Sequence, residues 1–171
     1  MPAERSTAQL IDLVPICNRL PSMTVDQLIG ATRVIARAGP HMSHRKLGTA
    51  LHLDDEKVVG LLDFLSRLGL VEAIGSDIAL TESGKSISAS KMSDRRRLFV
   101  EPALRLPIVH EIVESLSAQL SRSLPRNKLL TDLGAHTCPS DADRVFDHVM
   151  GWGQYAGLFY YDRETELVRL F

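Results

Sequence analysis

The stretch of this sequence closest in pattern to a phosphate-binding loop is residues 79–86, Ala-Leu-Thr-Glu-Ser-Gly-Lys-Ser. A loop that wraps phosphates needs glycine freedom along its length and must follow a strand of a parallel sheet. Here the middle of the loop is Leu-Thr-Glu-Ser, and no alternation of strands and helices surrounds it. We therefore expect Thr81 to cap a helix that begins near Glu82, with Gly84 allowing close packing, instead of a nucleotide site.

Histidine and cysteine offer little for metal or covalent chemistry. His41 and His44 are three residues apart, and His136 precedes Cys138 by two, but neither pair has an adjoining third ligand. Serines are plentiful, yet no nucleophile elbow or catalytic carboxylate pair accompanies them. We predict no catalytic residue, no metal site and no cofactor, and hence a protein that is not an enzyme.

Two clusters are candidates for binding a protein partner. The first is basic and contains Lys91 and residues 95–97; it is either a solvated helix face or a patch that docks on an acidic surface or a phosphate. The second is aromatic and ends a helix at residues 152–159; most of it should be core, with any exposed edge available to a partner. The predicted partner-binding residues are Lys91, Arg95, Arg96, Arg97, Trp152 and Tyr155.

Composition narrows the class of protein. The 171 residues include 20 Lys and Arg against 21 Asp and Glu, so no overall positive charge attracts nucleic acid or anionic membrane. The apolar runs are too short to cross a bilayer, and Asp12 and Pro15 interrupt the segment that a signal peptide would need. Cys17 and Cys138 form no CxxC pair, which fits reduced thiols. We expect a cytoplasmic protein that does not insert into membranes.

The elements that must position these residues follow a recognisable order. Residues 1–22, with three prolines, are expected to be an irregular lead-in. A helix should begin at Thr24, which stands three residues before Gln27 as in a capping box, and two more should follow Ser43 and Asp54. Gly69 should end the third helix, and residues 70–81 should form a β-hairpin. Three helices and a hairpin predict a winged-helix unit over residues 23–90.

The same order recurs in the second half. Helical patterns cover residues 93–99, 107–120, 127–133 and a segment starting at Ser140, before a second hairpin at residues 158–171. Leu47 matches Leu129 after 82 residues, and Gly69 matches Gly157 after 88. We predict a mainly α fold with small β-hairpin wings (α+β), made of tandem winged-helix units at residues 23–90 and 91–171.

A winged helix suggests DNA binding through its third helix. In this chain the first such helix starts with Asp54, Asp55 and Glu56, and the second with Asp141 and Asp143. These carboxylates suit the positive end of a helix dipole, but they repel phosphates. The charge pattern therefore argues against nucleic acid, and a winged-helix transcriptional regulator remains the alternative function.

Several short motifs resemble one known family. They are residues 80–84, 95–99, 124–126, 152–159 and 161–162, and they recur in that family's order over most of residues 25–170. The chain resembles the C-terminal AAA-associated domain, which is fused behind the ATP-binding subunit of nitrate, sulfonate and taurine-type ABC importers or is free-standing. Gly151 and Gly157 stand where the family usually carries acidic residues.

The resemblance implies a non-catalytic accessory module that acts on or beside an ABC ATPase. The chain itself has no ATP-binding cassette. The expected partner is an ABC transporter ATP-binding subunit or another protein, with a homodimer as a further possibility. An enzyme that binds nucleotide has only residues 79–86 in its favour.

Overall fold

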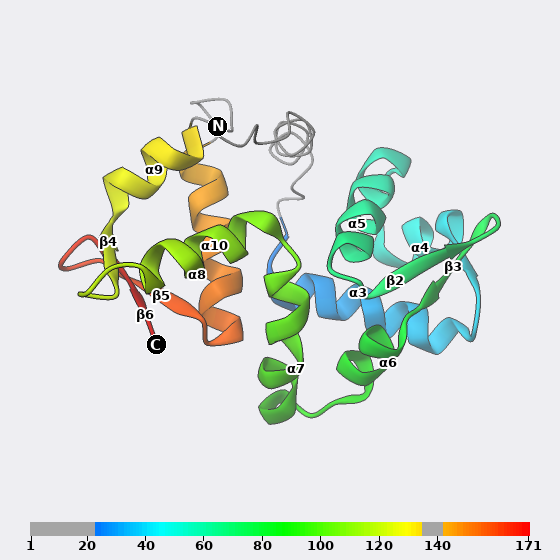
Figure 1. Ribbon diagram of the computed structural model, residues 1–171. Helices are drawn as coiled ribbons and strands as arrows, with labels where there is room; N and C mark the ends of the chain where they lie inside the picture. The colour runs from blue at the N-terminus through cyan, green and yellow to red at the C-terminus, as the bar shows by residue number, and fades with distance from the viewer. Residues whose placement is uncertain (1–22, 135–141) are drawn as a thin grey trace, which may run out of the picture.

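The structure, a computed structural model, describes residues 23–134 and 142–171 (Figure 1). The expected irregular lead-in at residues 1–22 lies outside the described residues, as do Cys17, His136 and Cys138. Within the described ranges, no helix is long and apolar enough to cross a membrane.

The first half of the chain has the predicted order of helices and hairpin. Thr24 caps α3 (Val25–Ala38) in a complete capping box with Gln27, as its spacing predicted. Ser43 and Asp54 cap the next two helices, and Gly69, with φ of +69°, follows the third. The elements are α3, β1 (Met42–Ser43), α4 (His44–Leu51), α5 (Asp55–Arg67), β2 (Val71–Ile74) and β3 (Asp77–Leu80).

The second half repeats this order. Its elements are α8 (Pro107–Ser117), β4 (Ser123–Pro125), α9 (Arg126–Gly134), α10 (Ala142–Ala156), β5 (Phe159–Asp162) and β6 (Leu167–Leu170). Each half has a three-stranded antiparallel sheet, in the order β1-β3-β2 and β4-β6-β5. The registers match as well: Met42 pairs with Ile78 in the first sheet, and Leu124 pairs with Val168 in the second.

Two helices connect the halves. The first, α6 (Glu82–Ala89), packs on α3, and the second, α7 (Met92–Leu104), packs on α10. Figure 1 shows α7 near the middle of the molecule, between the two halves, and α6 below α3 on the side of the first half. The sequence predicted the start of each helix. The helix α7 is longer than the predicted segment, which ended at Phe99, and it contains the buried residue Pro102.

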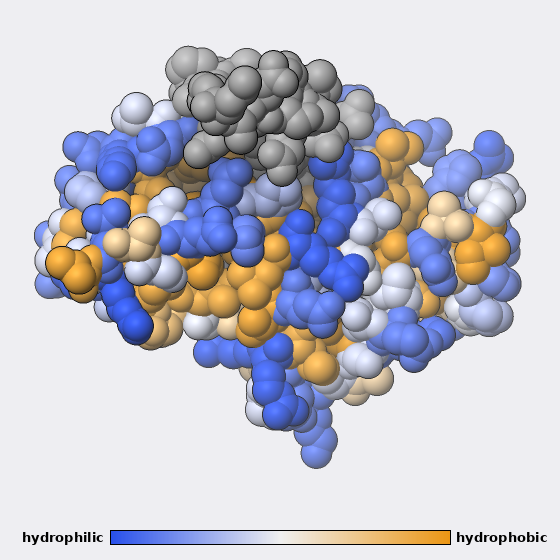
Figure 2. Space-filling view, in the orientation of Figure 1, coloured by the Kyte–Doolittle hydropathy of each residue, from blue (hydrophilic) through white to orange (hydrophobic). Residues whose placement is uncertain are grey.

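Apolar side chains from both halves and from α6 and α7 form one continuous hydrophobic core. Polar residues cover most of the face in Figure 2, and apolar side chains show between them, among other places over α8 and α10. The predicted fold class, mainly α with small β-hairpin wings, is confirmed. The division into units at residues 23–90 and 91–171 stays a prediction, and a single core extends across it.

Candidate partner-binding site

A groove of about 350 Å³ lies between the N-terminus of α3 and one face of α10. It is open to solvent along one side and mostly apolar in its lining. The lining residues are Met23, Thr24, Val25, Asp26, Asp147, His148, Gly151, Trp152 and Tyr155. The groove therefore contains both aromatic residues that the sequence singled out for partner binding.

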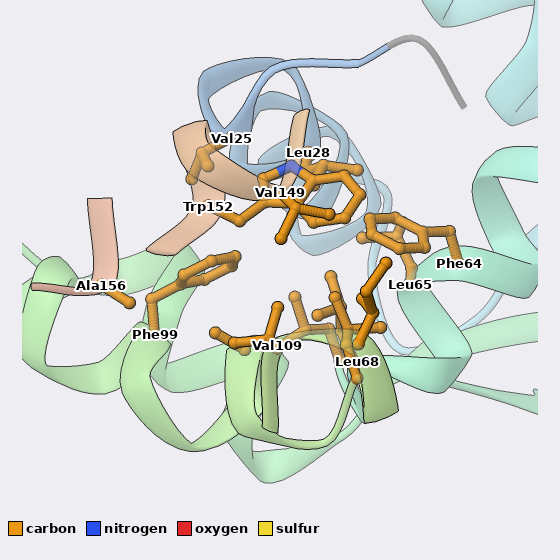
Figure 3. Close-up of a cluster of buried hydrophobic side chains, with 14 of the residues drawn as sticks. Val25, Leu28, Phe64, Leu65, Leu68, Phe99, Val109, Val149, Trp152 and Ala156 are labelled. Carbon is orange, nitrogen blue, oxygen red and sulfur yellow. The ribbon is translucent and has the colours of Figure 1, made fainter. Parts of the chain in front are cut away.

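Trp152 forms the inner wall of this groove and is only 1% exposed. Its ring lies 4.8 Å from the ring of Phe64, measured between centroids, and Figure 3 shows it among Val25, Leu28 and Val149. The expected exposed edge of Trp152 is therefore absent in the structure. The physical reason is that α10 packs between α3 and the other second-half elements, so this side chain joins the two halves from within.

Tyr155 is partly exposed and brings the two predicted clusters together. Its ring meets Phe99 edge-on at 5.5 Å, and the guanidinium carbon of Arg96 lies 5.9 Å from the ring centroid. That distance is within the range of a cation–π contact. The hydroxyl of Tyr155 is buried and has no hydrogen-bond partner among the described residues. The basic cluster of α7 and the aromatic cluster of α10 thus share one edge of the groove.

Arg95, in contrast, is a buried structural residue. It is 6% exposed, and its Nη2 donates a hydrogen bond of 2.8 Å to the backbone carbonyl of Ser90, which ends α6. This bond brings a positive charge to the C-terminal end of a helix dipole, where it is favourable. Its position four residues before buried Phe99 places it on the inner face of α7. Arg96 and Arg97 are exposed, whereas the side chain of Arg95 is not accessible at the surface.

Lys91 is exposed at the N-cap position of α7, where its side chain makes no capping hydrogen bond. It lies on the same helix as Arg96 and Arg97. The structure thus leaves three of the four predicted basic residues free to meet a partner.

Charges of both signs border the groove. Asp26 is in the first turn of α3, where it suits the helix dipole, and Asp147 faces it from α10. His148 is held in place by its Nδ1, which lies 2.7 Å from the carbonyl oxygen of Arg144. With Arg96 at the Tyr155 edge, an apolar surface is flanked by carboxylates and a guanidinium. Such a surface can bind and orient a peptide segment of complementary charge.

The described residues offer no comparable arrangement for metal binding, because no group of three His, Cys, Asp or Glu side chains comes together in them. His41 and His44 are exposed on the far side of the first half. The pair of His136 and Cys138 lies outside the described residues.

Residues 79–86 form a helix cap, as predicted. The backbone N–H of Gly84 donates to Thr81 Oγ1 at 3.1 Å, and that hydroxyl donates to the carbonyl of Gly69 at 2.6 Å. A Cβ at Gly84 would overlap the carbonyl oxygen of Leu70, so the glycine provides close packing of α6 on the chain before β2. The backbone of Leu70 and the side chain of Leu80 therefore occupy the space beside Gly84.

The aromatic motif at residues 152–159 has a packing role. A Cβ at Gly153 would overlap the ring of Phe159, which is fully buried. Gly157, with φ of +70°, makes the turn from α10 into β5. The motif therefore holds α10 against its own hairpin. Of its two aromatic residues that line the groove, Trp152 is buried and Tyr155 is partly exposed.

Sequence reasoning missed Met23, Asp26, Asp147 and His148. A signal was present for α10: Asp147, Gly151 and Tyr155 are spaced by four and must share a helix face. No comparable signal exists for α3, because periodicity within one helix cannot reveal which other helix lies opposite.

The comparisons with known proteins give one match. The family model for the C-terminal AAA-associated domain matches residues 45–162, which include α7, α10 and most of both sheets. Neither the curated proteins nor the solved structures include a match. The matched range covers more than half of the sequence and contains every motif that carried the resemblance. The chain belongs to the C-terminal AAA-associated domain family.

Proposed function

We propose that this protein is a non-catalytic accessory subunit that contacts the ATP-binding subunit of an ABC importer. Family membership supports an accessory role beside ABC ATPases. The contact site is the groove between α3 and α10, together with the exposed basic residues of α7. The protein would act in the cytoplasm, where that subunit binds ATP.

One observation carries this proposal: Arg96 lies over the ring of Tyr155 at the edge of the groove. Two clusters far apart in the sequence, each predicted to bind a partner, form a single surface there. Tyrosine and arginine are the residue types that dominate binding energy in protein interfaces. An apolar side chain of the partner would enter the groove, and flanking charges would meet Asp147 and Arg96.

Regulation would follow from preferential binding. A protein that binds one conformation of the ATPase more tightly shifts the population toward it, by an amount set by the difference in affinity. By linkage, ATP or its hydrolysis products must then change the affinity for this protein in turn. No catalytic group on this chain is needed for such an effect.

The alternative of a DNA-binding regulator has less support. In the second half, the helix that would read the groove, α10, buries its side chains against α3, α7 and α8. In the first half, α5 opens with Asp54, Asp55 and Glu56, all exposed. Neither helix offers a basic, free face to a duplex. A gel-shift titration with duplex DNA at low salt should show no complex.

The direct test is co-purification with the ATP-binding subunit encoded next to this protein. We expect a complex, and an ATPase rate that changes when this protein is added. Reversing the charge of Arg96 and Arg97 to Glu should weaken the complex by about tenfold or more, since rim charges set complementarity. Arg163→Glu together with Lys128→Glu is the matched control, because both residues are exposed in the second half, away from α7.

The outcomes separate clearly. Equal weakening by the control pair would mean that net charge, and not the groove edge, determines binding. If no complex forms and the ATPase rate stays constant, the proposed partner is wrong. Light scattering would then show whether the same surface joins two copies of this chain, and Arg96→Glu with Arg97→Glu should dissociate such a dimer.

A further inference from the structure

Residues 27–53 contain no aspartate or glutamate, although the chain as a whole has a net charge of −1. This stretch runs from α3 through β1 to the end of α4 and carries an exposed group of cationic and imidazole side chains. We call it the basic surface; its members are Arg33, Arg37, His41, His44, Arg45 and Lys46. None of the six forms an ion pair within the described part of the chain.

The fold brings these residues to one end of the molecule. Arg33 and Arg37 are one turn apart on α3, and His44, Arg45 and Lys46 are the first three residues of α4, which packs on α3. His41 lies in the short connection between them. Figure 1 shows α4 and the end of α3 at the opposite end of the molecule from β5 and β6. The groove with Tyr155 is a separate surface on α10.

Folding requirements do not account for this charge. Arg37 suits the last turn of α3, but three basic or imidazole side chains in the first turn of α4 oppose its dipole. In the second half the matching residue to His44 is Arg126, which pairs with Asp143 and lies 5.1 Å from the ring of Phe146. At this matched position the second half uses its charge for packing, whereas the first half leaves the side chain of His44 exposed.

We propose that the basic surface binds the headgroups of an anionic lipid bilayer. The large apolar side chains exposed on the first half, Val59 and Ile74, are on α5 and β2, outside this surface. A partner must therefore recognise it by charge, whereas protein interfaces bury an apolar centre. Exposed Arg and Lys attract the negative surface of a membrane without insertion into it. The proposal does not depend on the ATPase contact.

Nucleic acid is the competing anionic partner, and the structure favours it less. The basic surface has no Phe, Tyr or Trp on which bases could stack. A duplex would also have to meet α5, whose first residues are acidic. Those acids follow the C-terminal end of α4, and its eight residues span about 12 Å, more than the Debye length of about 8 Å. A flat bilayer can contact one end of α4 without the other.

Vesicle flotation tests the proposal with the whole chain. We expect binding to vesicles of phosphatidylcholine with phosphatidylglycerol, none to phosphatidylcholine alone, and release at high salt. Arg45→Gln with Lys46→Gln should lower the partition coefficient by about 25-fold, and Arg33→Gln with Arg37→Gln by a similar factor, from about fivefold for each charge. The first pair removes charge that opposes the dipole of α4, so folding should be preserved.

Lys128→Gln with Arg163→Gln is the matched control, with the same change in charge on exposed residues of the second half. It should bind vesicles nearly as the parent does. Equal binding to neutral and anionic vesicles, or equal loss in the control pair, would overturn the proposal. So would tighter binding to a DNA duplex at the same salt, and so would release by inorganic phosphate at headgroup concentration, which would indicate a site for the free ion.

Discussion

The third helices of the two halves, α5 and α10, occupy the same place in the repeat but different places in the molecule. With the spacing of 88 residues that relates Gly69 to Gly157, Phe64 corresponds to Trp152, and these two rings pack against each other at an interplanar angle of 36°. Yet α5 exposes Val59 at 62%, whereas α10 is covered by α3, α7 and α9. The helix α10 thus lies at the centre of the molecule, and α5 lies at its edge.

The two halves therefore differ in what their third helix does. The buried side chains of α10 connect the two halves through a common core, and one remaining face of α10 lines the groove. The first half contributes fewer buried side chains through α5 and keeps its charges in solvent. A repeat of one supersecondary unit therefore does not imply a repeat of function.

The largest effect should come from Trp152→Ala. Removing a fully buried indole at the joint should lower the free energy of unfolding by about 3–5 kcal/mol, measured in urea. Val59→Ala, at an exposed position of α5, is the control and should change it by less than about 0.5 kcal/mol. A loss below about 1 kcal/mol for Trp152→Ala would mean that the halves do not depend on this joint.

A smaller effect should come from glycine substitutions in the same two helices. In α10, Gly153→Ala should cost about 1–3 kcal/mol, because the new methyl group would overlap the ring of Phe159. In α5, Gly60→Ala should stabilise by up to about 1 kcal/mol, since nothing lies near its Cβ position and alanine favours helix.

Gly151→Ala serves as the control within α10 itself. Its Cβ position is also open, so a cost as large as that of Gly153→Ala would show that α10 rejects any substitution, whatever the space. Thermal unfolding followed by circular dichroism measures all three variants.

The paired charge of the second half and the unpaired charge of the first half should also differ. Arg126→Ala removes the ion pair with Asp143 and the contact with Phe146, and should cost about 1 kcal/mol. Arg45→Ala should have no measurable cost, because its side chain has no partner among the described residues. If both variants lose the same stability, the first half uses its charges for folding after all.

The smallest effect concerns Asp162 at the second hairpin turn. A hydrogen bond from the Thr165 hydroxyl, at 2.7 Å, holds the pKa of this carboxyl below its usual value of 3.8. A carboxyl whose pKa is lowered on folding stabilises the protein fully at pH values above its unfolded pKa. This contribution is lost as the pH falls through the lower, folded-state pKa.

Asp162→Asn should therefore lower the melting temperature slightly at neutral pH, and the difference should close as the pH falls below 3.8, through the lowered pKa of Asp162. Gly75, with φ of +63°, makes the first hairpin turn instead, so Ser76→Ala should show no such pH dependence. A difference that persists in acid would assign the role of Asp162 to turn geometry.

Local features of the fold were accessible from sequence. The capping box at Thr24, the cap at Thr81 and the hairpin after Gly69 each depend on residues within a few positions of one another. The two matching orders of elements followed from these signals. Such features can be predicted because the interaction that forms each of them joins residues that are close in the sequence.

The site was only partly accessible. Arg95 looked like its neighbours in a basic run, although its spacing from Phe99 marks the buried face of α7. The repeat places Phe64 and Trp152 at corresponding positions, but it does not indicate that their rings touch each other. Contacts between helices that are distant in the sequence depend on how their whole surfaces pack together. Composition and residue spacing do not predict that packing.

The continuous core has a consequence for how two weak contacts could work together. Because both halves pack around shared side chains, the groove beside Tyr155 and the basic surface are fixed in one frame. A partner held at the first would present the second at a set tilt and a high effective concentration. Neither contact would then have to be strong alone, because binding at one raises the effective concentration for the other.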